Sequence, residues 1–310
     1  MKRFRDILIC MLLLVSGTLI SQEQAIFTQY HLQPVLINPG ATGFGNDHHL
    51  LANYRSKWSA FEGAPKTFTF LYSGAVNDRI GLGAQILSDQ IGPNRILNIQ
   101  LNYAYKFKAD LLDMGIGLST GIQSFNLKDI GDDPFIQSGD ILIAEALDGV
   151  QYFDASFGFY GTYDNTFKFG LSFPNLVRSR ITDISGDIDV DANEFGYILF
   201  LGYMHQVKDY NFSVEPSLAV KKIRYVPFQA DVNLLFRFLD EQLIGGLTYS
   251  FGAGDRLGFL IGTRVNDLRL HYSYDVNFGP FQQYNNGSHE FSISYVLPGK
   301  TVQQTPPSGE

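Results

Sequence analysis

Apolar residues recur at every second position through most of this chain, in fourteen separate segments. Ile99, Leu101 and Tyr103, for example, alternate with Gln100 and Asn102. Neighbouring side chains of a β-strand point to opposite faces, so each segment predicts a strand with one apolar and one polar face. The predicted strands are residues 48–58, 66–75, 79–88, 95–107, 113–124, 151–163, 166–174, 195–205, 211–221, 226–238, 242–251, 256–265, 268–278 and 288–297.

The lengths of the connections distinguish a membrane barrel from a soluble β-sandwich, which would show the same alternation. In chain order, the second, sixth and twelfth connections are tight turns around Asn77, Asp164 and Asn266, and long connections fall only at odd positions. Outer-membrane barrels have this asymmetry, with short periplasmic turns and longer surface loops. Closure also pairs every backbone polar group in lipid. The sequence therefore predicts an all-β fold, a transmembrane antiparallel β-barrel of about 14 strands.

The composition agrees with a barrel wall that faces lipid. Hydrophobic residues make up 45% of the chain and charged residues only 17%. No apolar run of about 18 residues follows residue 21, so no transmembrane helix is predicted. Tyrosines such as Tyr103 and Tyr272 are expected in the aromatic girdles at the two membrane interfaces. The net charge of −8 disfavours nucleic-acid binding, which needs a basic face, so we expect outer-membrane lipid and no nucleic acid as a partner.

The first 21 residues have the layout of a secretory signal peptide. Three basic residues near the start precede an apolar run over residues 7–15, and small residues follow up to Ser21. This run is too short to anchor the protein in a bilayer. The expected location is the outer membrane of a Gram-negative cell after cleavage. Cys10 is the only cysteine, so the mature chain would contain none.

Two segments do not follow the strand pattern. A fourteen-stranded barrel has a lumen wider than side chains alone fill. The segment before the first strand is rich in proline and glycine, yet too apolar for a free linker. We predict that it forms a plug in the periplasmic mouth or the lumen, contributed by Phe27, Gln29, Tyr30, Asn38 and Pro39. The predicted parts are a signal peptide (1–21), a plug-like segment (22–47), the barrel (48–297) and a disordered tail (298–310).

Glycines are frequent within the predicted strands. Examples are Gly81, Gly115, Gly117 and Gly158. Glycine weakens a strand interior and marks bends or close approaches of another backbone. We expect these glycines to serve bends and close approaches in a curved sheet.

Two N-terminal blocks carry a resemblance to a known family. The first is Phe27-Thr28-Gln29-Tyr30, Pro34, Ile37-Asn38-Pro39 and Gly43, and the second is Tyr54-Arg55-Ser56, Trp58 and Phe61-Glu62-Gly63-Ala64-Pro65-Lys66-Thr67. Together they resemble the PorP/SprF family of the Bacteroidetes type IX secretion system. Weaker matches follow at Gly92-Pro93, Glu215-Pro216-Ser217, Tyr272-Ser273-Tyr274-Asp275 and Ser288-His289-Glu290.

This resemblance implies an outer-membrane protein that serves type IX secretion. The implied partners are components of that system and a specific large secreted cargo, which the barrel would help to secrete, anchor or display. In some bacteria the cargo is an adhesin of gliding motility. The alternation alone predicts only the barrel, so a channel or transporter for a small or hydrophobic solute remains the alternative function.

The second block is the best candidate for partner binding. It forms the end of the first predicted strand, the first surface connection and the start of the second strand. Trp, Tyr and Arg dominate the hot spots of protein interfaces. We therefore predict partner binding by Arg55, Lys57, Trp58, Phe61, Glu62 and Lys66. The alternative, equally open, is that this block only folds the connection back over the barrel.

A search for catalytic motifs gives one weak match. Residues 117–121 read G-x-S-x-G, but a nucleophile elbow needs its serine at a bend between a strand and a helix. Ser119 lies within a predicted strand, so a glycine-rich strand is the preferred interpretation. Since no phosphate-binding or dinucleotide motif is found either, we predict that the chain is not an enzyme and has no cofactor.

Two clusters of acidic residues suggest calcium binding, but neither has the sequence of a known calcium-binding loop. Asp183, Asp187, Asp189, Asp191 and Glu194 lack the glycine and glutamate that an EF-hand loop requires, since Ala192 and Ile198 occupy those positions. A looser carboxylate site remains an alternative to a solvated surface loop. Asp129, Asp132 and Asp133 receive the same interpretation, and the six histidines lack metal-ligand spacing. We therefore predict no metal site.

Overall fold

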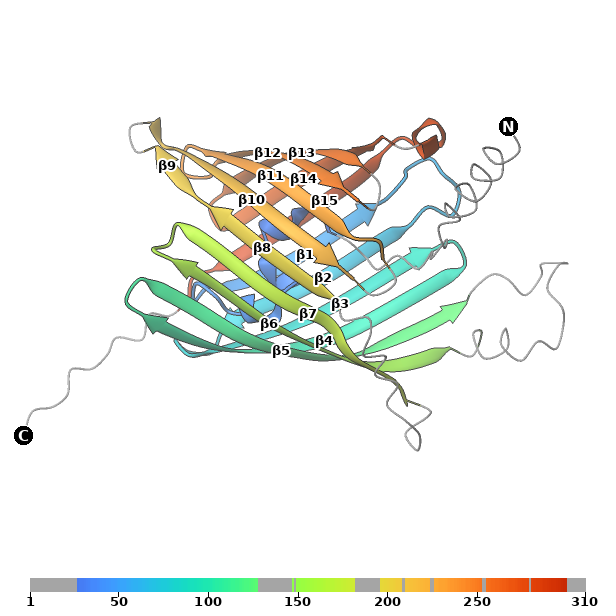
Figure 1. Ribbon diagram of the computed structural model, residues 1–310, viewed down its shortest axis with the longest axis horizontal. Helices are drawn as coiled ribbons and strands as arrows, with labels where there is room; N and C mark the ends of the chain where they lie inside the picture. The colour runs from blue at the N-terminus through green and yellow to red at the C-terminus, as the bar shows by residue number, and fades with distance from the viewer. Residues whose placement is uncertain are drawn as a thin grey trace, which may run out of the picture.

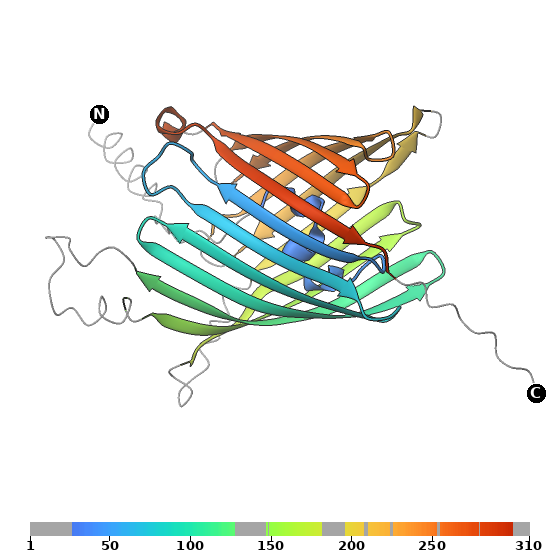
Figure 2. The same ribbon diagram turned by 180° about the vertical axis from the view of Figure 1, so that it is seen from behind.

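The chain forms an antiparallel β-barrel in which the first and last strands pair and close the wall (Figures 1 and 2). A computed structural model describes residues 27–127, 147, 149–181, 196–207, 210–223, 226–252, 255–278 and 280–299. The strands are β1 (His48–Ser56), β2 (Lys66–Ala75), β3 (Ile80–Ile91), β4 (Asn94–Ala109), β5 (Leu112–Leu127), β6 (Val150–Tyr163), β7 (Phe167–Arg180), β8 (Tyr197–Tyr203), β9 (His205–Val207), β10 (Phe212–Lys222), β11 (Gln229–Phe238), β12 (Leu243–Phe251), β13 (Arg256–Val265), β14 (Leu268–Asn277) and β15 (Ser288–Leu297).

The predicted strand number is confirmed. Strands β8 and β9 both pair with β10 and are separated only at Met204, so they count as one strand of the wall. Fifteen elements therefore make fourteen barrel strands. Most ends differ by three residues or fewer, but β7 continues six residues past its predicted end, to Arg180. β3 extends to Ile91, although the alternation already fades at Ser88. Beyond Ser88, backbone pairing of β3 with β4 continues up to Ile91 although the outer face is no longer apolar.

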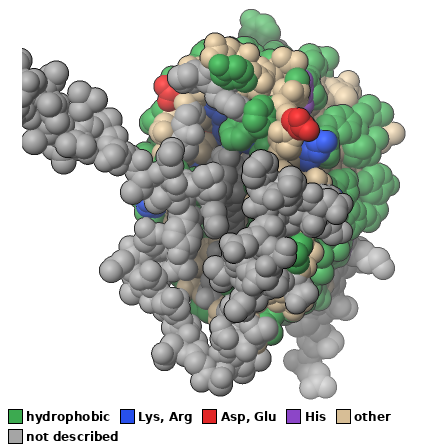
Figure 3. Space-filling model, turned by 90° about the vertical axis from the view of Figure 1, so that its right-hand side faces the viewer, with side chains coloured by type: hydrophobic (Ala, Val, Ile, Leu, Met, Phe, Trp, Pro, Cys, Tyr) green, Lys and Arg blue, Asp and Glu red, His purple; other side chains and the backbone are tan. Residues whose placement is uncertain are grey.

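The apolar and polar faces are arranged as predicted. On β4, the side chains of Ile99, Leu101 and Tyr103 point outward and are 50%, 64% and 46% exposed, whereas Asn102 and Lys106 point into the barrel and are buried. Hydrophobic side chains cover the outer flank in the view onto one end of the barrel (Figure 3). A wall that is apolar outside and polar inside is typical of a barrel embedded in lipid.

No helix in the described part of the chain has the length and apolar character needed to cross a membrane.

The tight turns gather at one end of the barrel. Asp164 and Asn165, between β6 and β7, both have positive φ (52° and 50°), which fits a two-residue hairpin turn. Asn266, between β13 and β14, also has positive φ. Because short turns of outer-membrane barrels face the periplasm, we call this the periplasmic end and the other the surface end. The periplasmic end is on the left in Figure 1.

The N-terminal segment lies inside the barrel, where it is drawn in blue in Figures 1 and 2. Its three short 3-10 helices are η1 (Gln29–His31), η2 (Pro34–Leu36) and η3 (Pro39–Ala41). Tyr30 is 1% exposed and packs with wall residues such as Leu51, Leu71 and Phe200 in one hydrophobic cluster. The expectation of a segment tucked into the lumen is therefore confirmed. We call residues 27–47 the plug.

Several predicted features fall outside the described residues. These are the signal peptide, the part of the plug-like segment before Phe27, most of the C-terminal tail, and the acidic clusters at Asp129, Asp132 and Asp133 and at Asp183, Asp187, Asp189, Asp191 and Glu194.

Candidate functional site

The inner part of the plug, Asn38–Thr42, lies directly against glycines of the barrel wall. A Cβ atom added to Gly81, Gly115 or Gly117 would overlap a plug carbonyl oxygen, and one added to Gly158 would overlap the side chain of Asn38. Gly40 on the plug is equally close to the wall, since its Cβ would lie 2.8 Å from the carbonyl oxygen of Gly115. These wall glycines therefore make room for the plug, and curvature alone does not explain them.

Hydrogen bonds hold this inner part in place. The Asn38 side chain donates to the carbonyl of Phe159 at 2.7 Å and accepts from Gly40 N at 2.9 Å. Closer to the periplasmic end, Gly43 N donates to Ser73 Oγ at 2.9 Å. Lys106 Nζ donates to the Gly43 carbonyl at 2.8 Å. The buried ammonium group of Lys106 thus makes a charge-assisted hydrogen bond to the plug backbone, at the point where the plug leaves the lumen.

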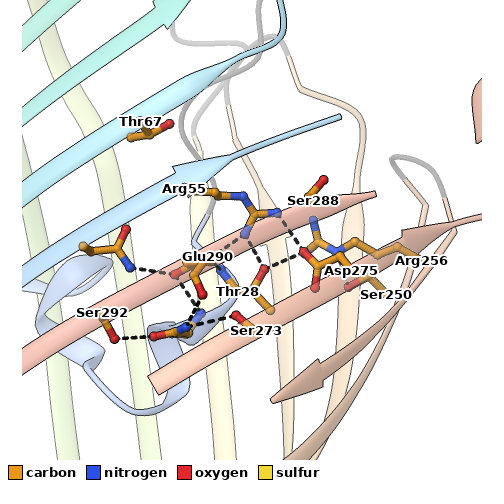
Figure 4. A network of polar contacts seen from close by, with 12 residues as sticks. Thr28, Arg55, Thr67, Ser250, Arg256, Ser273, Asp275, Ser288, Glu290 and Ser292 are labelled. Carbon is orange, nitrogen blue, oxygen red and sulfur yellow. Dashed lines mark hydrogen bonds and ion pairs between the residues drawn. The ribbon is translucent and has the colours of Figure 1, made fainter. Parts of the chain in front are cut away.

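The outer part of the plug, Phe27–His31, is held by polar side chains near the surface end (Figure 4). Thr28 donates from its backbone N to Glu290 Oε2 and from Oγ1 to Asp275 Oδ2, both at 2.8 Å. The Gln29 side chain donates to Ser273 Oγ at 3.0 Å, and its oxygen accepts from Ser292 Oγ at 2.5 Å. The plug therefore crosses the lumen lengthwise, from the surface half at Thr28 to the periplasmic end.

A buried ion group surrounds Thr28. Arg55 from β1 pairs with Asp275 of β14 at 2.9 Å and with Glu290 of β15 at 2.6 Å, and it also contacts the Thr28 hydroxyl. Asn53 donates to Glu290 at 2.9 Å. All of these side chains are nearly inaccessible to solvent. One cation and two carboxylates leave a formal charge of −1, and a charge buried in this way is stable only while its partners remain.

Tyr30 belongs to a second polar group on the neighbouring part of the wall. Its hydroxyl donates to Asp231 at 3.0 Å and accepts from Asn233 at 3.1 Å. Lys221 pairs with the same carboxylate and lies 4.6 Å from the centre of the Tyr30 ring, which is a cation–π contact. Burial lowers the pKa of the adjacent His31 to about 4, so this side chain is neutral at pH 7.

The first surface connection, residues 57–65, is built around an unusual backbone. Trp58 and Ala60 have positive φ (52° and 69°), which is rare for residues with a side chain and costly for a bulky one. Ser59 N donates to the Gly287 carbonyl at 2.8 Å, which ties this connection to the one between β14 and β15. Lys57 Nζ lies 4.4 Å from the centre of the Trp58 ring. Strained backbone of this kind is held in place by its surroundings and clusters at functional sites.

The six residues proposed for partner binding do not lie together. Arg55 is only 4% exposed and points into the lumen, because it occupies an inward position of β1. Lys57 and Trp58 are half-buried on the connection, whereas Phe61, Glu62 and Lys66 are exposed at the surface end. Arg55 therefore contacts the plug, and five residues remain as surface candidates.

Several residues of this site were not identified from the sequence. They are Thr28, Asn53, Asp275, Glu290 and the glycines that face the plug. A usable signal was present, since Arg55, Asp275 and Glu290 all occupy polar-face positions near the surface ends of their strands. Closure of the barrel makes β14, β15 and β1 neighbours, which brings these charges together.

A cavity of about 120 Å³ lies between the plug and the wall strands β3 to β8 and β10. Its wall side is rich in carboxamides, including Gln85, Asn98, Gln100 and Asn102. Ser119, the serine of the G-x-S-x-G match, accepts from Gln100 at 2.5 Å. Within the described residues, no three His, Cys, Asp or Glu side chains are placed to hold a metal ion.

Comparisons with solved structures show which fold this is. The TodX monoaromatic hydrocarbon channel deltaS2S3 mutant is 13% identical with a TM-score of 0.53, and the alignment covers 85% of this chain and 94% of that one. The Ralstonia pickettii toluene transporter TbuX is 12% identical with a TM-score of 0.50, covering 86% and 93%. At such low identity these similarities establish the barrel fold alone. No curated protein sequence matches the chain.

The comparison with protein families is direct. A family model described as "Type IX secretion system membrane protein PorP/SprF" matches residues 19–295. This range contains the plug and every strand up to the end of β15. The barrel and the family together place the protein in the outer membrane. The chain belongs to the PorP/SprF family of type IX secretion system membrane proteins.

Proposed function

We propose that this barrel holds or receives a specific large secreted partner at the cell surface and so supports its secretion, anchoring or display. The family match over residues 19–295 carries the proposal. The partner would be a secreted cargo protein, in a gliding bacterium an adhesin, working with other components of the type IX system.

The first surface connection supports this proposal. It presents Phe61, which is 45% exposed, beside the strained Trp58. Aromatic side chains on a rigid support are favoured at the centres of protein interfaces because little entropy is lost when they bind. Lys57, Glu62 and Lys66 would form the polar rim of such an interface.

A channel or transporter function is the second candidate. The solved structures with a similar fold include proteins described as a monoaromatic hydrocarbon channel and a toluene transporter. The cavity beside the plug could accept a small solute. The plug occupies the lumen, so passage of a solute would require it to move.

Two measurements separate the candidates. If the proposal is right, deleting the gene leaves one large secreted protein absent from the cell surface, and the tagged barrel copurifies with that protein from outer membranes. A channel would instead conduct ions in planar bilayers or admit solute into liposomes. Normal surface exposure of every secreted cargo in the deletion strain would contradict the proposal.

A further inference from the structure

The two ends of the plug are held by different kinds of contact. The inner part is wedged between backbones, because the wall glycines leave no space around Pro39 and Gly40. The outer part, Phe27–His31, touches the wall through hydrogen bonds from Thr28, Gln29 and Tyr30 and through the apolar packing of Phe27 and Tyr30. Hydrogen bonds to polar side chains can be exchanged for water or another ligand, whereas a wedged backbone cannot be exchanged without moving the wall.

The wall keeps its charge balance when the outer part leaves. Arg55 still pairs with Asp275 and Glu290, and Asn53 still donates to Glu290. The side chains that Phe27–His31 contributes carry no formal charge at neutral pH, given the lowered pKa of His31. Its departure would break hydrogen bonds and uncover apolar surface without leaving a charge unpaired, so the costly step of breaking a buried ion pair is avoided.

We name these wall groups the seat: Asn53, Arg55, Ser273, Asp275, Glu290 and Ser292. The seat binds both main-chain and side-chain groups of the outer part of the plug. Glu290 accepts the main-chain N–H groups of Thr28 and Gln29, at 2.8 and 3.4 Å. Asp275 accepts a hydroxyl, and Ser273 and Ser292 bind a carboxamide. An acidic side chain in the place of Thr28 would face the carboxylates of Asp275 and Glu290, so a neutral or basic segment is favoured over an acidic one.

The seat lies next to the surface candidates for partner binding. Arg55 precedes Trp58 by three residues along the chain, and Trp58 N donates to Ser288 Oγ at 3.3 Å on the strand that carries Glu290. A partner on the first surface connection would therefore have the seat within reach of an extended segment of a few residues.

We propose that Phe27–His31 is a displaceable latch, and that its seat binds an extended peptide segment of the secreted partner in place of the latch. The segment would carry a hydroxyl residue followed by a carboxamide residue, like Thr28-Gln29, and no acidic side chain. The secreted source of that segment rests on the proposed function, whereas the displaceable latch and the peptide-binding seat stand on the geometry of the lumen.

The test needs no secreted partner. A fluorescent, end-capped peptide with the sequence of residues 27–32 is titrated against the full chain in nanodiscs. Thr28→Ala/Gln29→Ala weakens the latch and leaves every seat residue intact, and Tyr30→Ala weakens it through a different contact. Each variant is expected to bind the peptide at least tenfold more tightly than the unchanged protein. Adding Glu290→Gln to either variant should abolish the gain.

Two controls make the result decisive. Ser73→Ala removes a contact of the inner plug and should leave peptide affinity unchanged. Hydrogen exchange of the amides at residues 27–31 should accelerate in both latch variants. The proposal is overturned if exchange does not accelerate, or if it accelerates and the peptide still binds no better. Loss of the partner from Phe61→Ala cells with normal peptide binding would support the proposed function, and normal partner retention there would count against the proposed function alone.

Discussion

Thr28 and Asp275 are joined by a hydrogen bond of 2.8 Å between side chains separated by 247 positions in the chain. Arg55 contacts both residues, so the two N-terminal blocks that resemble the family meet at this point. One block supplies the end of the plug and the other supplies the cation that holds its binding site together. The shared sequence thus encodes an internal contact as well as a surface connection.

Replacing Arg55 by methionine should destabilise the barrel strongly. The substitution leaves Asp275 and Glu290 buried without their cation, and breaking a buried ion pair on one side costs about 3–5 kcal/mol. The measurement is the free energy of unfolding from denaturant titration in lipid vesicles. Arg264→Met removes a cation that is 3.7 Å from Glu241 and 41% exposed, so its cost should stay within about 1 kcal/mol. Equal effects of the two substitutions would contradict the importance of the buried group.

Gly117→Ala should displace the inner plug. The added methyl group overlaps the Pro39 carbonyl, and overpacking of a tight contact costs about 1–3 kcal/mol. Hydrogen exchange of residues 38–42 should therefore accelerate. Gly245→Ala is the matched control, because no atom lies within 4 Å of a Cβ added there. Unchanged hydrogen exchange in Gly117→Ala would show that the added methyl group does not loosen the inner plug.

Leu101→Arg should test the lipid-facing side of β4. Leu101 is at the middle of the strand and 64% exposed on the outer face. Arginine on the lipid face at the midplane of the bilayer costs about 2–4 kcal/mol. Leu111→Arg makes the same change in the periplasmic turn after this strand, where Leu111 is 54% exposed, and should cost little. Equal free energies of unfolding for Leu101→Arg and Leu111→Arg would argue against a position of Leu101 at the midplane of the bilayer.

Trp58→Gly should weaken retention of the partner while the first surface connection keeps its backbone conformation. Glycine tolerates the φ of 52° better than tryptophan, so the connection keeps its shape while the aromatic ring is lost. We expect at least a tenfold loss in partner captured from outer membranes, as for an interface hot spot. Tyr210→Ala removes a side chain that is 78% exposed in a periplasmic turn and should change nothing. If Trp58→Gly captures as much partner as the unchanged protein, the Trp58 ring is not part of the interface.

Acidification should loosen the outer plug. Burial depresses the pKa of His31 from 6.5 to about 4 against the smaller, opposing effect of Glu215. A depressed histidine pKa means that the released state binds the proton more readily, so the stabilisation is complete above pH 6.5 and declines as the pH falls towards 4. Amide exchange at residues 27–31, corrected for its intrinsic pH dependence, should report the change. His31→Phe should remove most of it.

The barrel could be predicted from sequence because lipid and lumen impose opposite demands on alternate side chains. Most of the wall shows this alternation in the sequence, and the lengths of the connections indicate which end of the barrel faces the periplasm. The extra length of β3 and the break at Met204 could not be predicted, since backbone pairing alone determines them. The place of the plug followed from its apolar, proline-rich composition.

The contacts of the candidate site could not be predicted. Thr28, Arg55, Asp275 and Glu290 come together only when the first strand closes against the last. Arg55 was grouped with the surface residues because of its neighbours in the sequence, although its position on β1 points inward. Close approaches are expected at the glycines of β3, β5 and β6, but a single sequence does not show that the approaching backbone is the plug.

Residues 27–47 are made before any strand of the wall, and the glycine-lined fit around Pro39 and Gly40 is too tight for later threading. We therefore expect the seam between β1 and β15 to close only after this segment is in place. The plug would then act as an internal template on which the pairing of β1 with β15 is completed.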